Sequence, residues 1–98
     1  MKLAYRITVK EFCSSHEVEE SFIDTLFEYE LISMQVEEKE KYLQNDELSE
    51  LEKMVRLYKE LGVNPEGIQI IQHLLYKIEN HQKELQQLRN KLSRFEDL

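Results

Sequence analysis

The most regular hydrophobic pattern in the chain occupies its last third. Large side chains recur there at alternating steps of three and four residues, namely Ile71, Leu74, Ile78, His81, Leu85, Leu88, Leu92 and Phe95. We call these eight residues the seam, because this spacing places them along one side of a helix, as in a coiled coil. Just upstream, Asn64-Pro65-Glu66 combines an N-cap residue, a proline suited to the first helical position and an acidic first turn. The pattern predicts one long helix within residues 63–98.

This helix is too long to be covered by the rest of a chain of 98 residues. About 30 helical residues span roughly 45 Å, and packing against a small head can bury only the first two turns. A seam left in water would be a sticky apolar surface. We therefore predict a homodimer in which the seam pairs with the same helix of a second subunit, with His81 fixing the register or facing its twin.

The orientation of the two arms stays open at this stage. A parallel pair would set Glu84 against Arg89 and Lys91 against Glu96 of the other chain, and both pairs attract. The charges alone therefore favour parallel arms.

Residues 1–62 predict a small head that begins with a short strand within residues 3–7 and a helix over residues 9–15. Thr8 and Glu11 have the spacing of a capping box at the start of this helix. Val9, Phe12 and Cys13 recur at helical intervals and are expected to face inward.

A second helix is predicted over residues 19–31. Its apolar positions follow three- and four-residue steps that give one buried face, namely Phe22, Ile23, Leu26, Phe27 and Tyr29. The opposite face carries Glu20, Asp24 and Glu28, each four residues apart. Like charges at this spacing destabilise a helix by a few tenths of a kcal/mol per pair, so the acidic face suggests use by a partner, although simple solvation would also explain it.

Residues 32–43 alternate loosely between apolar and polar around a charged tip, which predicts a β hairpin or wing. Asn45 is a candidate N-cap for a third helix. Its inward stripe is predicted to contain Leu48, Leu51, Met54, Val55, Leu57 and Tyr58. Gly62 would end this helix in the left-handed conformation. With only two Gly and one Pro in the chain, the fold class is all-α, with a head over residues 1–62 and a dimerisation helix over residues 63–98.

Charge then changes the functional interpretation. Between Glu11 and Glu52 the chain has fourteen Asp or Glu and two basic residues, Lys39 and Lys41, and its net charge is −7. DNA binding depends on clustered Lys and Arg that neutralise phosphates. An acidic head argues against nucleic acid and favours a basic protein partner, with Glu19, Glu20, Asp24 and Glu28 as the candidate binding residues.

The sequence shows no arrangement typical of an enzyme or a metal centre. Cys13 is expected in the core, His16 in a turn and His73 on an outer helix face, and none has an evident catalytic companion. A metal site at His81 lacks further ligands at suitable spacing. We predict no enzyme activity and no cofactor. The single cysteine and the lack of a signal peptide or an apolar span indicate a cytoplasmic protein.

The order of these parts resembles the MerR superfamily, which has a winged helix-turn-helix head and a long dimerisation helix. The resemblance is carried by Tyr5 to Phe12, by Glu30-Leu31-Ile32, by Tyr42-Leu43 and by the terminal coiled coil. Within the superfamily, the chain is most similar to the CbpM chaperone modulators. The features that carry this are the block Arg56-Leu57-x-x-Glu60-Leu61-Gly62-Val63-Asn64-x-x-Gly67-Ile68 and the tail from Glu84 to Phe95.

This resemblance implies an inhibitor that binds the J-domain of the DnaJ-like co-chaperone CbpA and prevents its stimulation of a DnaK-type ATPase. It also implies antiparallel dimer arms, which we adopt. Two departures argue against DNA reading: Asp24 stands where MerR regulators usually have Arg, and Glu30 stands where they usually have Gly. The alternative function is a MerR-like transcription regulator whose phosphate contacts would be Arg6, Lys10, Lys39 and Lys41. A purely structural dimerisation module is a third alternative.

Overall fold

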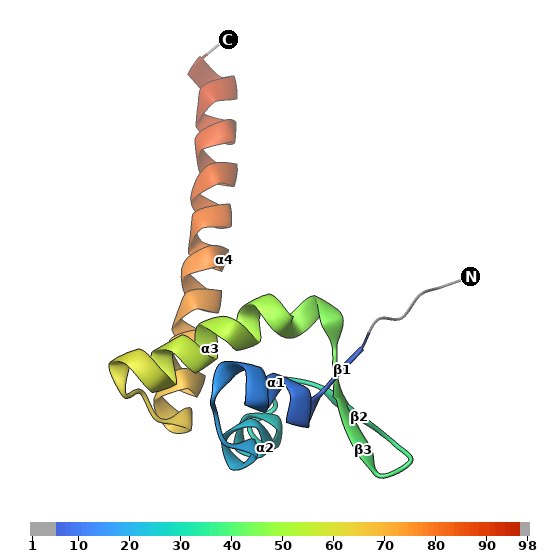
Figure 1. The fold of residues 1–98 in the computed structure, drawn as a ribbon. Helices are drawn as coiled ribbons and strands as arrows, with labels where there is room; N and C mark the ends of the chain where they lie inside the picture. The colour runs from blue at the N-terminus through green and yellow to red at the C-terminus, as the bar shows by residue number, and fades with distance from the viewer. Residues whose placement is uncertain (1–5, 97–98) are drawn as a thin grey trace, which may run out of the picture.

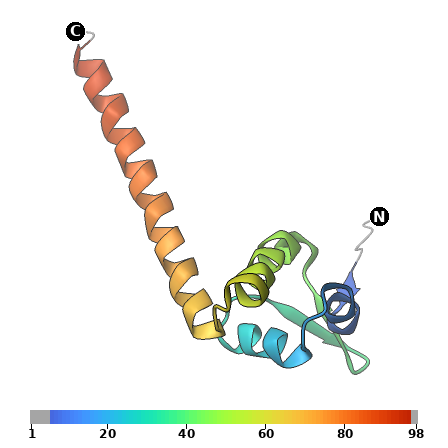
Figure 2. The ribbon, with the colours of Figure 1, turned by 60° about the vertical axis from the view of Figure 1, so that its left-hand side comes forward.

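The computed structural model describes residues 6–96 and shows a small head from which one long helix projects (Figure 1). The elements in chain order are β1 (Ile7–Thr8), α1 (Val9–His16), α2 (Glu20–Glu28), β2 (Met34–Glu37), β3 (Glu40–Leu43), a 3₁₀ turn η1 (Asn45–Glu47), α3 (Leu48–Leu61) and α4 (Pro65–Glu96). Figure 2 shows α4 leaving the head as a straight arm. The predicted class is confirmed: a mostly helical protein with a small sheet and a long C-terminal helix.

The three strands form one antiparallel sheet in the order β1-β3-β2. β2 and β3 make the predicted hairpin, which we call the wing (Met34–Leu43), and its turn residues Glu38 and Lys39 both have positive φ. This is the backbone of the tight turns that match strand twist. Of the strand predicted within residues 3–7, residues 3–5 lie outside the described range, and the observed strand is Ile7–Thr8.

One core joins the head helices, the wing and the base of the arm. Its buried members are Val9, Phe12, Cys13, Phe22, Ile23, Leu26, Ile32, Leu43, Leu51, Met54, Val55 and Ile68. The ring of Phe22 also stacks on Tyr58 of α3, with centroids 4.0 Å apart. Because Ile68 is fully buried, the first turns of α4 are packed into the head core, which extends past residue 62.

Several predicted helix ends are confirmed. At the start of α1 the Glu11 N–H donates to Thr8 Oγ1 and the Thr8 N–H donates to Glu11 Oε1, which completes the capping box. Asn64 Oδ1 accepts the Gly67 N–H at 2.8 Å at the start of α4. Gly62 ends α3 with φ of 69°. These motifs could be predicted from the sequence because each involves residues only a few positions apart.

The prediction of Asn45 as the N-cap of the third helix is wrong. Asn45 lies inside η1, and α3 begins at Leu48 without a side-chain cap. The Asn45 carbonyl instead accepts the Leu48 N–H. A 3₁₀ turn that continues into a helix satisfies such donors through the backbone, so a capping side chain is not required.

The second helix is shorter than predicted, and Phe27 is not in its buried face. α2 ends at Glu28, and Glu30 follows with φ of 61°. The Leu31 N–H donates to the Leu26 carbonyl and the Glu30 N–H donates to the Phe27 carbonyl, the bonds of a Schellman motif. This reversal turns Leu31 and Ile32 toward the core, while Phe27 stays 44 % exposed.

Candidate partner-binding surface

The outer face of α2 carries the predicted acidic residues. Glu20 and Glu28 are exposed on the helix, and Glu19 is exposed just before it. None of these three carboxylates forms an ion pair with another residue in the range 6–96. They are therefore available to a positively charged partner.

Asp24 differs from its neighbours because the wing neutralises it. The Lys41 ammonium donates to Asp24 Oδ1 at 3.0 Å. This bond is the main cause of a raised pKa of Lys41. Half-exposed ion pairs contribute little stability, but this one fixes the orientation of the wing lysine toward α2 and away from an approaching ligand.

A second ion pair neutralises Arg6. Its guanidinium donates to Glu37 Oε1 at 2.8 Å and to Gln35 Oε1 at 3.3 Å, and it lies over the Tyr42 ring, 4.2 Å from the centroid. The hydrogen bond with Arg6 lowers the pKa of Glu37. Two of the four cations that a DNA-binding alternative would use, Arg6 and Lys41, are thus paired with carboxylates.

The other two basic residues named for DNA binding are exposed. Lys10 on α1 and Lys39 at the wing tip form no ion pair within the described part of the chain. Two isolated lysines make a weak phosphate-binding surface beside so many carboxylates.

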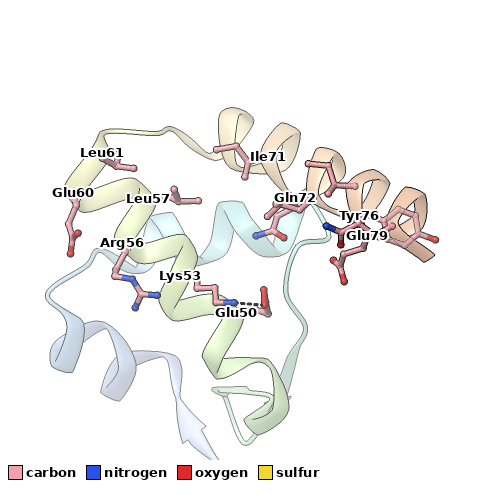
Figure 3. Close-up of a pocket in the computed structure, with 13 residues that line it drawn as sticks. Glu50, Lys53, Arg56, Leu57, Glu60, Leu61, Ile71, Gln72, Tyr76 and Glu79 are labelled. Atoms are coloured by element: carbon pink, nitrogen blue, oxygen red, sulfur yellow. Dashed lines mark hydrogen bonds and ion pairs between the residues drawn. The ribbon is translucent and has the colours of Figure 1, made fainter. Parts of the chain in front are cut away.

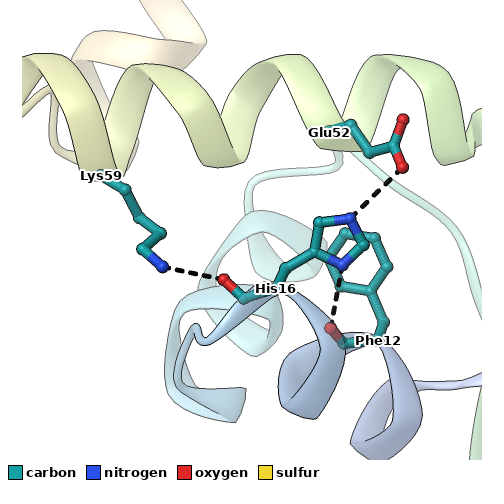
Figure 4. A network of polar contacts seen from close by, with 4 residues as sticks. All are labelled: Phe12, His16, Glu52 and Lys59. Atoms are coloured by element: carbon teal, nitrogen blue, oxygen red, sulfur yellow. Dashed lines mark hydrogen bonds and ion pairs between the residues drawn. The ribbon is translucent and has the colours of Figure 1, made fainter.

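The histidine predicted in a turn has a structural role between α1 and α3 (Figure 4). His16 is the last residue of α1, and its ring stacks on Phe12 with centroids 4.0 Å apart. Its Nδ1 lies 3.1 Å from the Phe12 carbonyl oxygen and its Nε2 lies 3.3 Å from Glu52 Oε2. Lys59 Nζ donates to the His16 carbonyl at 2.9 Å. His16 therefore ties α1 to α3.

Cys13 is buried, and this burial is the main cause of a raised pKa of its thiol. A thiol in that state is a poor nucleophile. Among residues 6–96, no group of three or more His, Cys, Asp or Glu side chains is placed to hold a metal ion. No helix in this range is long and apolar enough to span a membrane.

The seam of α4 runs along the projecting arm. Ile71 is half-buried at its base, whereas the remaining apolar seam residues are between 51 % and 74 % exposed: Leu74, Ile78, Leu85, Leu88, Leu92 and Phe95. His81 is exposed among them and contacts Glu84 of the same helix at 3.1 Å. The chain by itself leaves this apolar stripe uncovered.

A groove of about 1050 Å³ lies between α3 and the base of α4 (Figure 3). Its apolar lining comprises Leu57, Leu61, Ile71, Leu75 and Ile78. Charged side chains of both signs, among them Glu60, Arg56 and Glu79, line the rest. The sequence analysis missed this groove because it depends on how two helices meet. The sequence had placed Leu57 in the inward stripe of the third helix and Ile71 and Ile78 in the seam, but it did not bring the two sets together.

Comparison with known protein families places the chain in one of them. The family model described as MerR HTH family regulatory protein matches residues 7–90, which covers the head and most of α4. Neither a curated protein nor a solved structure matches the chain. The matched region agrees with the winged helix-turn-helix head and the long C-terminal helix of the structure. The chain belongs to the MerR HTH family of regulatory proteins.

Proposed function

We propose that this protein inhibits a DnaJ-like co-chaperone of the CbpA type by binding its J-domain through the acidic outer face of α2. The observation that carries the proposal is the state of the charges on the head. The carboxylates of Glu19, Glu20 and Glu28 are exposed and unpaired within residues 6–96, whereas Arg6 and Lys41 are engaged by acids. The head thus offers negative charge to a partner. The J-domain itself is suggested by the similarity of the chain to the CbpM modulators.

The mechanism is competition for a basic surface. A J-domain typically presents a basic helix to its DnaK-type chaperone, and an acidic helix is electrostatically complementary to it. Complementary charges accelerate encounter and exclude partners of the wrong sign. While the modulator occupies the basic helix, the chaperone cannot, and its ATPase is not stimulated.

The proposed active species is a homodimer. Pairing of two α4 arms would cover the exposed seam, and the apolar groove between α3 and α4 continues the seam onto the head. We favour antiparallel arms, in line with the resemblance to the MerR superfamily. This arrangement presents two α2 surfaces per dimer.

The test is isothermal titration into the isolated J-domain of the organism's own DnaJ-like protein. The Glu20→Lys/Glu28→Lys double variant is used because neither residue has an ion pair to lose within residues 6–96. Its affinity should fall by at least about tenfold at low salt and by less at high salt, since screening weakens charge attraction.

The matched control is Glu38→Lys/Asp46→Lys, which makes the same change in net charge at the wing tip and in η1. Both residues are exposed, have no ion pair within residues 6–96 and do not line the groove between α3 and α4. Unchanged binding by the α2 variant, or equal loss in the control, would refute the α2 site. A duplex DNA titration runs in parallel for the second candidate function, which the match to helix-turn-helix regulators favours. Binding to DNA without binding to the J-domain would make the protein a transcription regulator.

A further inference from the structure

A hollow of about 570 Å³ lies where α2 ends and the wing begins. Its lining is Phe27, Glu28, Glu30, Ile32, Ser33 and Met34. Ile32 is buried in the core and Met34 is half-buried, so they provide a rigid apolar floor. Phe27 stands at the edge with 44 % of its surface exposed.

Phe27 is unusual for an exposed residue because its neighbours on α2 are the proposed binding acids. Phe27 lies seven residues after Glu20, which places both on one face of α2, and Glu28 follows it directly. A large aromatic side chain within a charged surface is the typical composition of an interaction hot spot, where the aromatic supplies apolar contact and the charged rim supplies orientation.

The rim of the hollow is acidic only. Both charged residues that line it are carboxylates, Glu28 and Glu30, whereas the groove between α3 and α4 carries charges of both signs. Glu30 also adopts φ of 61°, a backbone conformation that glycine favours and that costs other residues stability. Glu17, Glu38 and Lys39 also have positive φ, so Glu30 is distinguished by its place on this rim.

The hollow is held in place from its far side. The Tyr29 hydroxyl donates to Glu66 Oε2 at 2.9 Å, which ties the end of α2 to the start of α4. Ser33 N–H donates to Glu47 Oε1 at 2.8 Å and ties the start of the wing to η1. Tyr29 and Ser33, at the two ends of the segment 29–33, are therefore held in place before a partner binds, which reduces the conformational entropy lost on binding.

We propose that this hollow is the apolar anchor point of the partner surface and that it takes one apolar side chain carried on a basic helix of the partner. Phe27 packs against that side chain over the floor of Ile32 and Met34. Glu28 and Glu30 contact Lys or Arg side chains that lie one turn along the partner helix from the apolar side chain. The inference rests on the proposed function for the identity of the partner, but its chemistry applies to any basic amphipathic helix.

The first test is the Phe27→Ala variant, titrated into the J-domain at low and high salt. Affinity should fall by about 30-fold at both salt concentrations, because truncating a hot-spot aromatic removes apolar contact, which salt does not screen. Phe27 is not a member of the buried core, so the variant should remain folded, which circular dichroism checks. The matched control is Val36→Ala, which truncates an apolar side chain on the wing that is 67 % exposed and does not line the hollow. Its affinity should equal that of the wild type.

The second test is Glu30→Gly, which should stabilise the fold while it weakens binding about threefold to tenfold at low salt. If Glu30 had only a structural role, Glu30→Gly would change the free energy of unfolding and leave the affinity for the J-domain unchanged. A designed helical peptide with Lys and Arg on one face and a row of Leu on the other serves as a second ligand. It should bind the wild type and not Phe27→Ala.

The outcomes separate this inference from the proposed function. If the J-domain binds wild type and Phe27→Ala equally but loses affinity for Glu20→Lys/Glu28→Lys, the anchor is wrong and the proposed function stands. If only the basic peptide binds, in a manner that depends on Phe27, the anchor stands and the J-domain is the wrong partner. Binding of neither ligand overturns both. Loss of the dimer in Phe27→Ala would assign the hollow to a second copy of the chain and overturn the proposal.

Discussion

At the residue scale, different residue types occupy the same left-handed backbone conformation after three helices of the head. A residue with positive φ follows each one: Glu17 after α1, Glu30 after α2 and Gly62 after α3. Glycine adopts this conformation without steric cost, whereas a side chain costs roughly 1–2 kcal/mol. The Glu17 carboxylate lies 3.9 Å from Lys59 Nζ, whereas the Glu30 carboxylate forms no ion pair within residues 6–96.

Placing glycine at position 30 and a residue with a side chain at position 62 should therefore change the free energy of unfolding in opposite directions. Glu30→Gly should raise the free energy of unfolding by about 1 kcal/mol, and Gly62→Ala should lower it by about the same amount. A Cβ added at Gly62 would meet nothing within 4 Å, so its effect reports the backbone alone. Urea unfolding at one protein concentration measures both. Destabilisation by Glu30→Gly would show that Glu30 contributes a stabilising contact.

The Arg6–Glu37 pair gives a pH-dependent prediction. Because Arg6 lowers the pKa of Glu37 in the folded state, the pair stabilises the fold above the unfolded pKa of Glu37, and this contribution is lost as the pH falls through the lowered folded pKa. Glu37→Gln should be less stable than wild type at pH 7, and the difference should vanish in acid.

Urea unfolding of wild type and Glu37→Gln, from pH 7 down into acid, measures the contribution of the Arg6–Glu37 pair. High salt at pH 7 is an independent check, because an exposed ion pair is screened and the difference should shrink. A difference between wild type and Glu37→Gln that persists unchanged in acid would assign the effect to something other than the ion pair.

At the element scale, α4 has two different environments. Its first turns pack on the head through Ile68, and the rest projects with an exposed seam. Seam residues spaced by three and four require a partner helix to leave water. The arm is therefore the element whose stability depends most on a second chain.

Leu88→Glu should break the proposed dimer and melt the distal part of α4, because it places a charge in the seam. The head should remain folded. Gln87→Glu is the control, since it adds the same charge beside the seam. Sedimentation equilibrium reports the mass and circular dichroism reports the helix content. A dimer that survives Leu88→Glu would place the dimer interface elsewhere.

The direction of the arms can be measured by disulfide trapping. If the arms are antiparallel and use the whole seam, Leu74 of one chain lies beside Leu92 of the other. A mixture of Leu74→Cys and Leu92→Cys chains should then oxidise to a mixed dimer, while either alone should not. Native Cys13 is buried and should not interfere. Efficient pairing of each variant with itself would show parallel arms.

At the scale of the whole molecule, the arm and the head share one core. Ile68 is fully buried against the head although it lies in the helix that forms the arm. The Tyr29–Glu66 hydrogen bond adds a polar link between α2 and the same helix, and it is the main cause of a raised pKa of Tyr29. The direction of the arm is therefore set by the head.

Ile68→Ala should test this coupling. The variant should destabilise the head by about 2–5 kcal/mol, the usual cost of a large-to-small change in a core. Gln69→Ala, at an exposed position of the same turn, should change the free energy of unfolding by less than about 0.5 kcal/mol. Urea unfolding followed by Tyr fluorescence measures both. A small effect of Ile68→Ala would mean that the arm is only loosely joined to the head.

The sequence by itself determined most of the elements and several of their ends. The capping box of Thr8, the restart at Asn64 and the left-handed Gly62 were predictable, because capping and helix spacing act between residues a few positions apart. The acidic character of α2 was also predictable, because counting the charged residues in the sequence is enough to recognise it. Asn45 was misassigned because its competitor, a 3₁₀ turn, has a similar local signature.

Only the tertiary structure decided which charges and apolar side chains are available. The Asp24–Lys41 and Arg6–Glu37 pairs join residues of different elements. As a result, both cations are engaged by carboxylates of the same chain. The exposure of Phe27 depends on where α2 stops and how Leu31 turns back. The groove beside Leu57 depends on the packing of α3 on α4. The ion pairs and the groove share one physical reason: they arise where segments distant in sequence pack together, and the spacing of residues within one segment does not encode that packing.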